Sequence, residues 1–280
     1  MSGSSYYVPH ETKWPFLATI ALMIMFIGLA NYMNDESTLT LTLTGLGLLL
    51  IVIYGWFSYV VRESEGGLYD DQVDMSFRWG MAWFIFSEVM FFAAFFGALY
   101  YARELSLPWL AGDGSGVSTN QELWPSFENV WPSNGPANYG GDFVVMKAAG
   151  IPALNTIILL ISGLTVTWAH HGLKEGKRNQ LILGLIATVL LGFIFVGFQA
   201  YEYSHAYNDL NLKMSSGIYG STFYMLTGFH GFHVTLGAIM LTVILFRCIR
   251  GHFSNENHFG FEAVALSLIH ISEPTRPGHI

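Results

Sequence analysis

Long apolar segments constrain this chain more than any other feature of its sequence. A helix that crosses the hydrocarbon core of a bilayer, about 30 Å thick, needs about 20 consecutive apolar residues, because its backbone groups must be hydrogen-bonded within the segment. Six such stretches recur along the chain, at residues 16–32, 39–61, 77–101, 151–170, 181–200 and 218–246. The sequence therefore predicts an all-α, polytopic bundle of transmembrane helices.

The composition agrees with a membrane protein and excludes an ordinary soluble domain. Only 11% of the residues are charged and 52% are hydrophobic, whereas soluble domains carry about 25% charged residues. The one cysteine, Cys248, excludes an intramolecular disulfide and a paired-copper site, which needs two thiolates. No phosphate-binding loop, nucleophile elbow or nucleic-acid patch occurs in the sequence. We therefore expect no redox centre, no metal site and no nucleic-acid partner.

The Lys and Arg residues favour one orientation of these spans. Eight lie on the side of the membrane that holds the N-terminus, and three lie on the other side. Because basic residues are retained on the cytoplasmic side, the N-terminus is predicted to lie inside. Residues 104–147, rich in Gly, Pro, Asn and Trp, then form an extramembrane loop on the outside rather than a separate domain.

Small residues recur within the predicted spans and indicate where helices could pack closely. Ala93 and Gly97 are four residues apart, and Gly228 and Gly231 are three apart. Such residues let helix backbones approach each other in lipid. They support a packed bundle but are common to all polytopic proteins.

Glu88 is a carboxylate near the middle of the third predicted span. A charged side chain at that depth costs at least ~2.5 kcal/mol on insertion scales, so it is expected to be protonated, paired or functional. One interpretation is a protonated carboxyl hydrogen-bonded within the bundle. The other is a group that carries protons. Desolvation raises the proton affinity of a carboxylate in both cases, so position alone does not separate them.

Several histidines lie in pairs that could ligate a metal or a haem. His230 and His233 are three apart in the sixth span, and His170 and His171 close the fourth. For the first pair, we find no carboxylate or further histidine at a matching depth in a neighbouring span. The second pair lies at a membrane interface. We therefore interpret the following residues as structural or facing a partner subunit: His170, His171, Glu202, His230 and His233.

Six strings of residues, taken together, resemble subunit III of the aa3-type cytochrome c oxidases. They are FIFSEVMFF at 84–92, TWAHH at 167–171, QAYEY at 199–203, GIYGSTF at 217–223, TGFHGFHV at 227–234 and HFGFEA at 258–263. Each string is placed at the corresponding helix, in the family's order, and the match as a whole runs from the first span to about Ala265. A chance combination of six such strings is not credible.

The resemblance implies a non-catalytic core subunit that belongs to an enzyme only as part of its complex. This subunit would support proton uptake, stability and oxygen access of catalytic subunit I, which reduces O2 with electrons from cytochrome c and pumps protons. Haem and copper would be held by partner subunits I and II, and none by this chain. The implied location is a bacterial inner membrane, in preference to a mitochondrial one, with the N-terminus in the cytoplasm.

The resemblance also implies a site for phospholipids. In the family the first two helices, here 16–32 and 39–61, lean away from the others and leave a lipid-filled cleft. The residues that match headgroup positions of that cleft are Arg62, Glu63, Arg247 and His252. Glu88 corresponds to the family's buried carboxylate. Residues 1–265 are then one membrane domain.

The last 15 residues, 266–280, depart from the family pattern. The family continues into a seventh helix, whereas this segment reads LSLIHISEPTRPGHI. Its two prolines and its short apolar run do not permit a span. The string resembles a translated adapter used in sequencing libraries, so we interpret the segment as non-native and expect six spans of a seven-helix design.

A different class of function is also consistent with an intramembrane acid. Glu88 could be the translocating group of a proton-coupled transporter or channel, with the histidines of the sixth span as a relay. That reading predicts inverted repeats and broken helices in corresponding halves. No such internal symmetry is visible in the sequence.

Overall fold

The predicted all-α class is confirmed by the computed structural model, which describes residues 7, 12–34, 38–138, 140–253 and 258–271. No β-strand occurs among these described residues. Among the described residues, six helices are long and apolar enough to cross a membrane. They are α1 (Trp14–Met33), α2 (Thr40–Glu65), α3 (Asp71–Tyr101), α6 (Ile151–Lys174), α7 (Arg178–Asn208) and α8 (Gly217–Arg250).

These helices extend beyond the apolar stretches that predict them. The third continues without a break through the π-helix η1 (Ala102–Ser106) and through α4 (Leu107–Leu110), which gives a span of 40 residues. Adding a residue to an existing helix costs little compared with starting a new one. Polar residues at the membrane surface therefore join the helix that the apolar segment begins.

The first compact unit of the chain comprises Met1–Arg78 and contains the hairpin of α1 and α2. Two glycines bring the backbones of these helices together. A Cβ atom added to Gly28 would lie 2.4 Å from the backbone nitrogen of Thr42, and one added to Gly45 would lie 2.4 Å from that of Met25. Close backbone approach of this kind is how helices associate in lipid.

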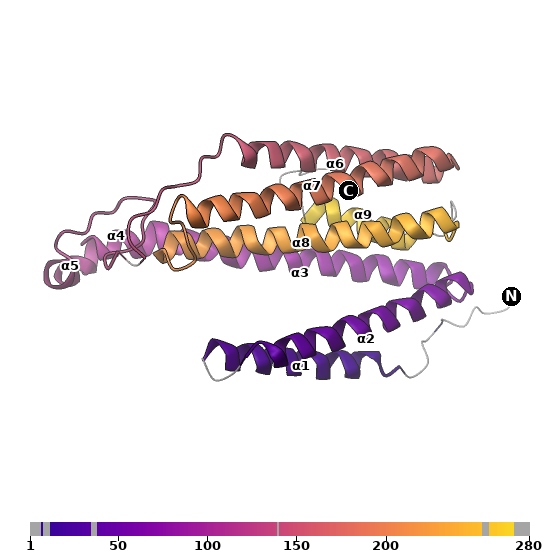
Figure 1. Cartoon of the computed structure of the whole chain (residues 1–280), viewed down its shortest axis with the longest axis horizontal. Coiled ribbons are helices and arrows are strands. Elements are labelled where there is room, and N and C mark those ends of the chain that lie inside the picture. The colour runs from indigo at the N-terminus through magenta and orange to yellow at the C-terminus, as the bar shows by residue number, and fades with distance from the viewer. Residues whose placement is uncertain (1–6, 8–11, 35–37, 139, 254–257, 272–280) are drawn as a thin grey trace. The chain divides into compact units, whose positions relative to one another are not determined.

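The second unit, Trp79–Ile280, holds α6, α7, α8 and the shorter helix α9 (Phe259–Ile271) around a common core. In Figure 1, α6 and α7 run beside each other and α9 lies behind α8. The core gathers near one end of these helices, and its most deeply buried side chains are Val166, Ala169, Leu185, Leu241 and Phe261. It fixes the positions of α6 and α9 relative to each other.

The segment between α3 and α6 contains short helices, η2 (Gly114–Gly116) and α5 (Val117–Leu123), and irregular backbone. Side-chain amides hold it in place. The amide of Asn120 donates to the carbonyl oxygens of Leu110 and Trp124, both at 3.0 Å. The amide of Asn211, after α7, donates to the carbonyl oxygens of Gly140 and Asp142. The segment is thereby tied to the connection between α7 and α8.

Candidate functional site: an intramembrane cavity beside a carboxylate–histidine pair

A cavity of about 880 Å³ lies among α3, α6, α7 and α8 in the second unit. Its walls are mainly apolar and include Phe92, Phe96, Leu159 and Phe195. A smaller set of polar side chains also lines it: Glu88, Asn155, Gln199, Glu202, Tyr203 and His230. An apolar cavity with a few convergent polar groups is the usual form of a site for a small apolar or amphipathic molecule.

Glu88 on α3 is paired with His233 on α8. Glu88 Oε2 lies 2.7 Å from His233 Nε2, and His233 Nδ1 lies 2.6 Å from the carbonyl oxygen of Phe229. A carbonyl oxygen only accepts hydrogen bonds, so Nδ1 must carry a hydrogen. One further proton is then shared between Nε2 and the carboxylate. The pair has no net charge whichever atom holds that proton.

Aromatic rings surround this pair. The ring of Phe92 lies 5.4 Å from that of His233, and the rings of Phe91 and Phe229 are 5.0 Å apart, edge to face. Both side chains of the pair are partly exposed, His233 at 17% and Glu88 at 20%. A pair without net charge is the form of a carboxylate and a histidine that lipid tolerates best.

The expectation that no carboxylate matches the sixth-span histidines in depth is wrong for His233. Its partner Glu88 lies on α3, far away in the sequence. Which helices neighbour each other in a bundle depends on packing, and a single sequence does not reveal it. Glu88 is also not the only acid beside the cavity, because Glu202 on α7 lines it too.

The other polar groups of the cavity are partly satisfied by one another. Tyr203 Oη lies 2.7 Å from Thr227 Oγ1, and Gln199 Nε2 donates to the carbonyl oxygen of Thr227 at 2.8 Å. Within the described part of the chain, the buried oxygens Gln199 Oε1, Glu202 Oε1 and Asn155 Oδ1 have no hydrogen-bond partner. They are available to a polar group that enters the cavity. Sequence reasoning missed Gln199 and Asn155, which carry no charge and form no motif with Glu88.

The predicted structural histidines lie in different environments. His230 lines the cavity with its ring edge-on to Phe195, at 5.7 Å between centroids. His171 is exposed on the last turn of α6. His170, one residue earlier, lies beside Glu262 of α9. The structure thus brings Glu88, Glu202, His230 and His233 together and places His170 elsewhere.

Comparison with known proteins identifies the family. The model of the family "Cytochrome c oxidase subunit III" matches residues 4–112 and 123–273. The chain belongs to the cytochrome c oxidase subunit III family. Cytochrome c oxidase subunit 3 of Gadus morhua is 40% identical over 262 residues, 93% of this chain and 89% of the relative. That of Prototheca wickerhamii is 42% identical over 269 residues, 95% of this chain and 91% of the relative.

Membership confirms the family predicted from the six strings and makes the chain a subunit of a respiratory oxidoreductase complex. The two matched ranges include the helices that form the site. The first contains Glu88, and the second contains Glu202, His230 and His233. The cavity and its paired acid are therefore part of a cytochrome c oxidase subunit III structure.

The residues that the subunit III resemblance assigns to lipid lie near helix ends. Arg62 is exposed on α2, and His252 follows α8. The guanidinium of Arg247 lies over the ring of Phe253, 4.4 Å from its centre. Glu63 differs from the others, because it is only 9% exposed and accepts hydrogen bonds from Tyr7 at 2.5 Å and Tyr69 at 2.9 Å. Lipid contact of these four residues stays a prediction.

The contact between Tyr7 and Glu63 depends on pH. The hydrogen bond to Glu63 raises the pKa of Tyr7 from 10.0 to about 12. Burial and the same carboxylate also raise the pKa of Tyr69. A tyrosine whose pKa is raised by folding stabilises the folded contact fully below its unfolded pKa, and this contribution is lost as pH rises through the folded pKa.

We therefore expect the contact of Tyr7 with Glu63 to be kept at neutral pH and to be lost between about pH 10 and about pH 12. A nitroxide attached at Thr12→Cys reports this loss as increased mobility in its electron paramagnetic resonance spectrum. The Tyr7→Phe variant should be mobile at every pH. A nitroxide at Glu122→Cys in the outer loop is the control. Equal mobility changes at both positions would show general unfolding and contradict the prediction.

Proposed function

We propose that this chain is a core subunit without a redox centre of its own, which packs against catalytic subunit I in a complex that also contains subunit II. It supports the proton uptake, stability and oxygen access of the catalytic subunit, whose haem and copper reduce O2 with electrons from cytochrome c. The observation that carries this proposal is the Glu88–His233 pair. Both ring nitrogens of His233 are engaged by protein oxygens, so this intramembrane histidine is not free to ligate a metal.

Two further features support a role beside a catalytic subunit. The apolar cavity offers a place for O2, which is itself apolar and partitions into apolar volumes. In the described part of the chain the apolar window of α3 contains no buried residue, and Trp83 and Phe86 are 67% and 54% exposed. Large exposed apolar surface on a helix in a membrane is covered by lipid or by another subunit. This surface supports docking of a partner.

The proposed orientation follows from the basic residues. The shorter connections α2–α3 and α6–α7 lie on the side with eight Lys and Arg residues, together with the N-terminus. We place that side in the cytoplasm of a bacterial cell, or in the equivalent matrix of a mitochondrion. Phospholipids beside Arg62, Arg247 and His252 complete the proposal.

The test is purification of the tagged chain in a mild detergent, followed by an optical spectrum. We expect haem-containing subunits to co-purify with it, and we expect the chain expressed alone to bind no haem. A complex from which the chain has been removed should still transfer electrons, but its activity should fall during turnover. Haem in the isolated chain would overturn the proposal. A chain that purifies without partners and conducts protons in liposomes would support the transporter alternative.

A further inference from the structure

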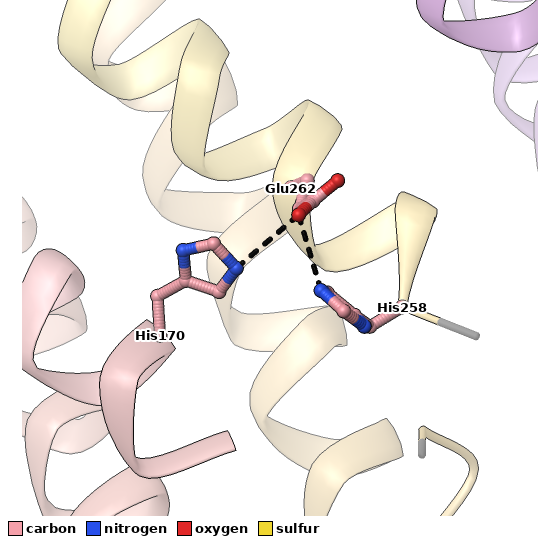
Figure 2. Close-up of side chains that lie close together, drawn as sticks. All are labelled: His170, His258 and Glu262. Atoms are coloured by element: carbon pink, nitrogen blue, oxygen red, sulfur yellow. Dashed lines mark hydrogen bonds and ion pairs between the residues drawn. The ribbon is translucent and has the colours of Figure 1, made fainter. Parts of the chain in front are cut away.

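Three side chains, from α6, from α9 and from the residue just before α9, converge at the end of α6 that the sequence predicts to face inward. Figure 2 shows the rings of His170, on α6, and His258, which precedes α9, turned toward the carboxylate of Glu262. Glu262 Oε1 lies 3.4 Å from His170 Nε2 and 3.1 Å from His258 Nε2. One ligand atom from each of the three residues lies within 4.8 Å of the others.

These separations match the spacing of ligands around a tetrahedral zinc ion. With Zn–N distances of about 2.0–2.1 Å and Zn–O distances of about 2.0–2.2 Å, ligand atoms in a tetrahedral site lie about 3.3–3.5 Å apart. The distance from His170 to Glu262 falls in this range, and the distance from His258 is slightly shorter. A small shift of the side chains would make the distances from His170 and His258 to Glu262 equal.

Hydrogen bonding alone does not account for the cluster. An N–H···O hydrogen bond spans about 2.7–3.2 Å, and among the described residues the buried His170 Nε2 has no hydrogen-bond partner. Yet this nitrogen points at a carboxylate that His258 also approaches. A buried polar atom without a partner is costly. A cation held between His170 and Glu262 would satisfy it.

The cluster is also held in place before any ion binds. His258 is 7% exposed and lies one helical turn before Glu262. The ring of His170 stacks on that of Phe261, with centroids 5.4 Å apart, and Phe261 is 1% exposed in the core. The three side chains are therefore positioned by the packing of α6 against α9. A rigid set of ligands of this kind loses little entropy when a metal binds.

We propose that His170, His258 and Glu262 bind a zinc ion at the interface of α6 and α9. Two imidazoles and one carboxylate suit Zn²⁺, whereas Mg²⁺ and Ca²⁺ prefer oxygen ligands throughout. The fourth position is open to water or to a ligand from a partner subunit. This inference departs from the sequence-based expectation that the chain has no metal site. The sequence held a sign of this site, since the string HFGFEA places His258 and Glu262 four residues apart.

The experiment starts with the assembled oxidase complex, stripped of metal at this site by a mild chelator and titrated with Zn²⁺ alone. Bound zinc is counted by mass spectrometry after gel filtration. Because loss of a second-shell partner alone costs about 10–100-fold in affinity, loss of a ligand in Glu262→Gln or His170→Gln should weaken binding at this site by at least about 100-fold. The parent complex should bind one zinc ion more than either variant.

His205→Gln is the matched control. His205 lies 2.7 Å from Asp209, which is also four residues away and directly follows α7, but this exposed pair has no third ligand among the described residues. The control should bind as much zinc as the parent complex. Equal zinc binding by the parent and by both ligand variants would overturn the proposal and leave a hydrogen-bonded cluster only.

A second measurement needs no substitution and remains decisive if the variants fail to assemble. Diethylpyrocarbonate modifies accessible imidazoles, and peptide mass spectrometry reports each one. Saturating Zn²⁺ should slow modification of His170, the more exposed histidine of the cluster, several-fold in the parent complex, with His205 unaffected. An unchanged rate at His170 would overturn the proposal. Mg²⁺ at the same concentration should give no protection, and protection by Mg²⁺ would contradict the assignment to zinc.

Discussion

Replacing Glu88 with alanine is expected to destabilise the subunit by about 1–3 kcal/mol, the usual cost of a buried polar group that loses its partner. The substitution leaves His233 Nε2 without the carboxylate that now lies 2.7 Å away, beside the ring of Phe92. The loss can be measured as a lower detergent concentration for dissociation of this subunit from the purified complex, in a titration with sodium dodecyl sulfate.

A double-mutant cycle measures the interaction energy between Glu88 and His233 separately from their contacts with other residues. Glu88→Ala combined with His233→Leu removes both polar groups, so the double variant should recover most of the lost stability. Glu88→Gln should stay close to the parent, because its amide can donate to His233 Nε2 in the same position. If the destabilisation of the double variant equals the sum of the two single variants, the pair does not interact and this account is wrong.

The same Glu88→Gln variant tests what the pair does during turnover. An amide cannot release a proton, so the variant removes any role as a proton carrier while it keeps the hydrogen bond. We expect the ratio of protons pumped to electrons transferred to be unchanged, because the proton of this pair is held in a hydrogen bond between Glu88 and His233. Loss of pumping with electron transfer intact would make Glu88 a proton carrier and favour the alternative function.

The six spans could be predicted from the sequence because one physical requirement decides them. A helix in lipid must be apolar over the thickness of the bilayer, and this requirement is read directly from 16–32, 151–170 and the other stretches. The ends of the helices were less predictable. α7 begins at Arg178 and ends at Asn208, well outside the predicted 181–200, because polar residues at the surface continue an existing helix at little cost.

The contacts between helices could not be predicted in the same way. The depth of Glu88 in the membrane could be predicted from the sequence. Its pairing with His233 could not, because it depends on which helices are neighbours. The contacts of the small residues could not be predicted either. Gly97 was a candidate for close packing, yet no described atom lies within 4 Å of a Cβ built on it, whereas a Cβ on Gly28 or Gly45 would meet the backbone of the facing helix at 2.4 Å. Spacing along one helix does not reveal which face meets another helix.

Gly45 gives this packing a direct test. We expect Gly45→Ala to destabilise the hairpin of α1 and α2 by about 1–3 kcal/mol, the usual cost of overpacking. The new methyl group would lie 2.4 Å from the backbone nitrogen of Met25 and 2.6 Å from its Cα, so the helices must separate. The effect is measurable as reduced recovery of assembled complex, and as cleavage between α1 and α2 by a protease in detergent.

Gly47→Ala is the matched control, two residues further along the same helix. A Cβ at Gly47 has no described atom within 4 Å, and alanine favours a helix over glycine by about 1 kcal/mol. This variant should therefore assemble as well as the parent or slightly better. Both substitutions exchange glycine for alanine within α2, so they change helix propensity in the same way. Opposite effects on stability would therefore come from the contact at Gly45. If Gly45→Ala and Gly47→Ala behaved alike, α1 and α2 would not pack backbone to backbone at Gly45.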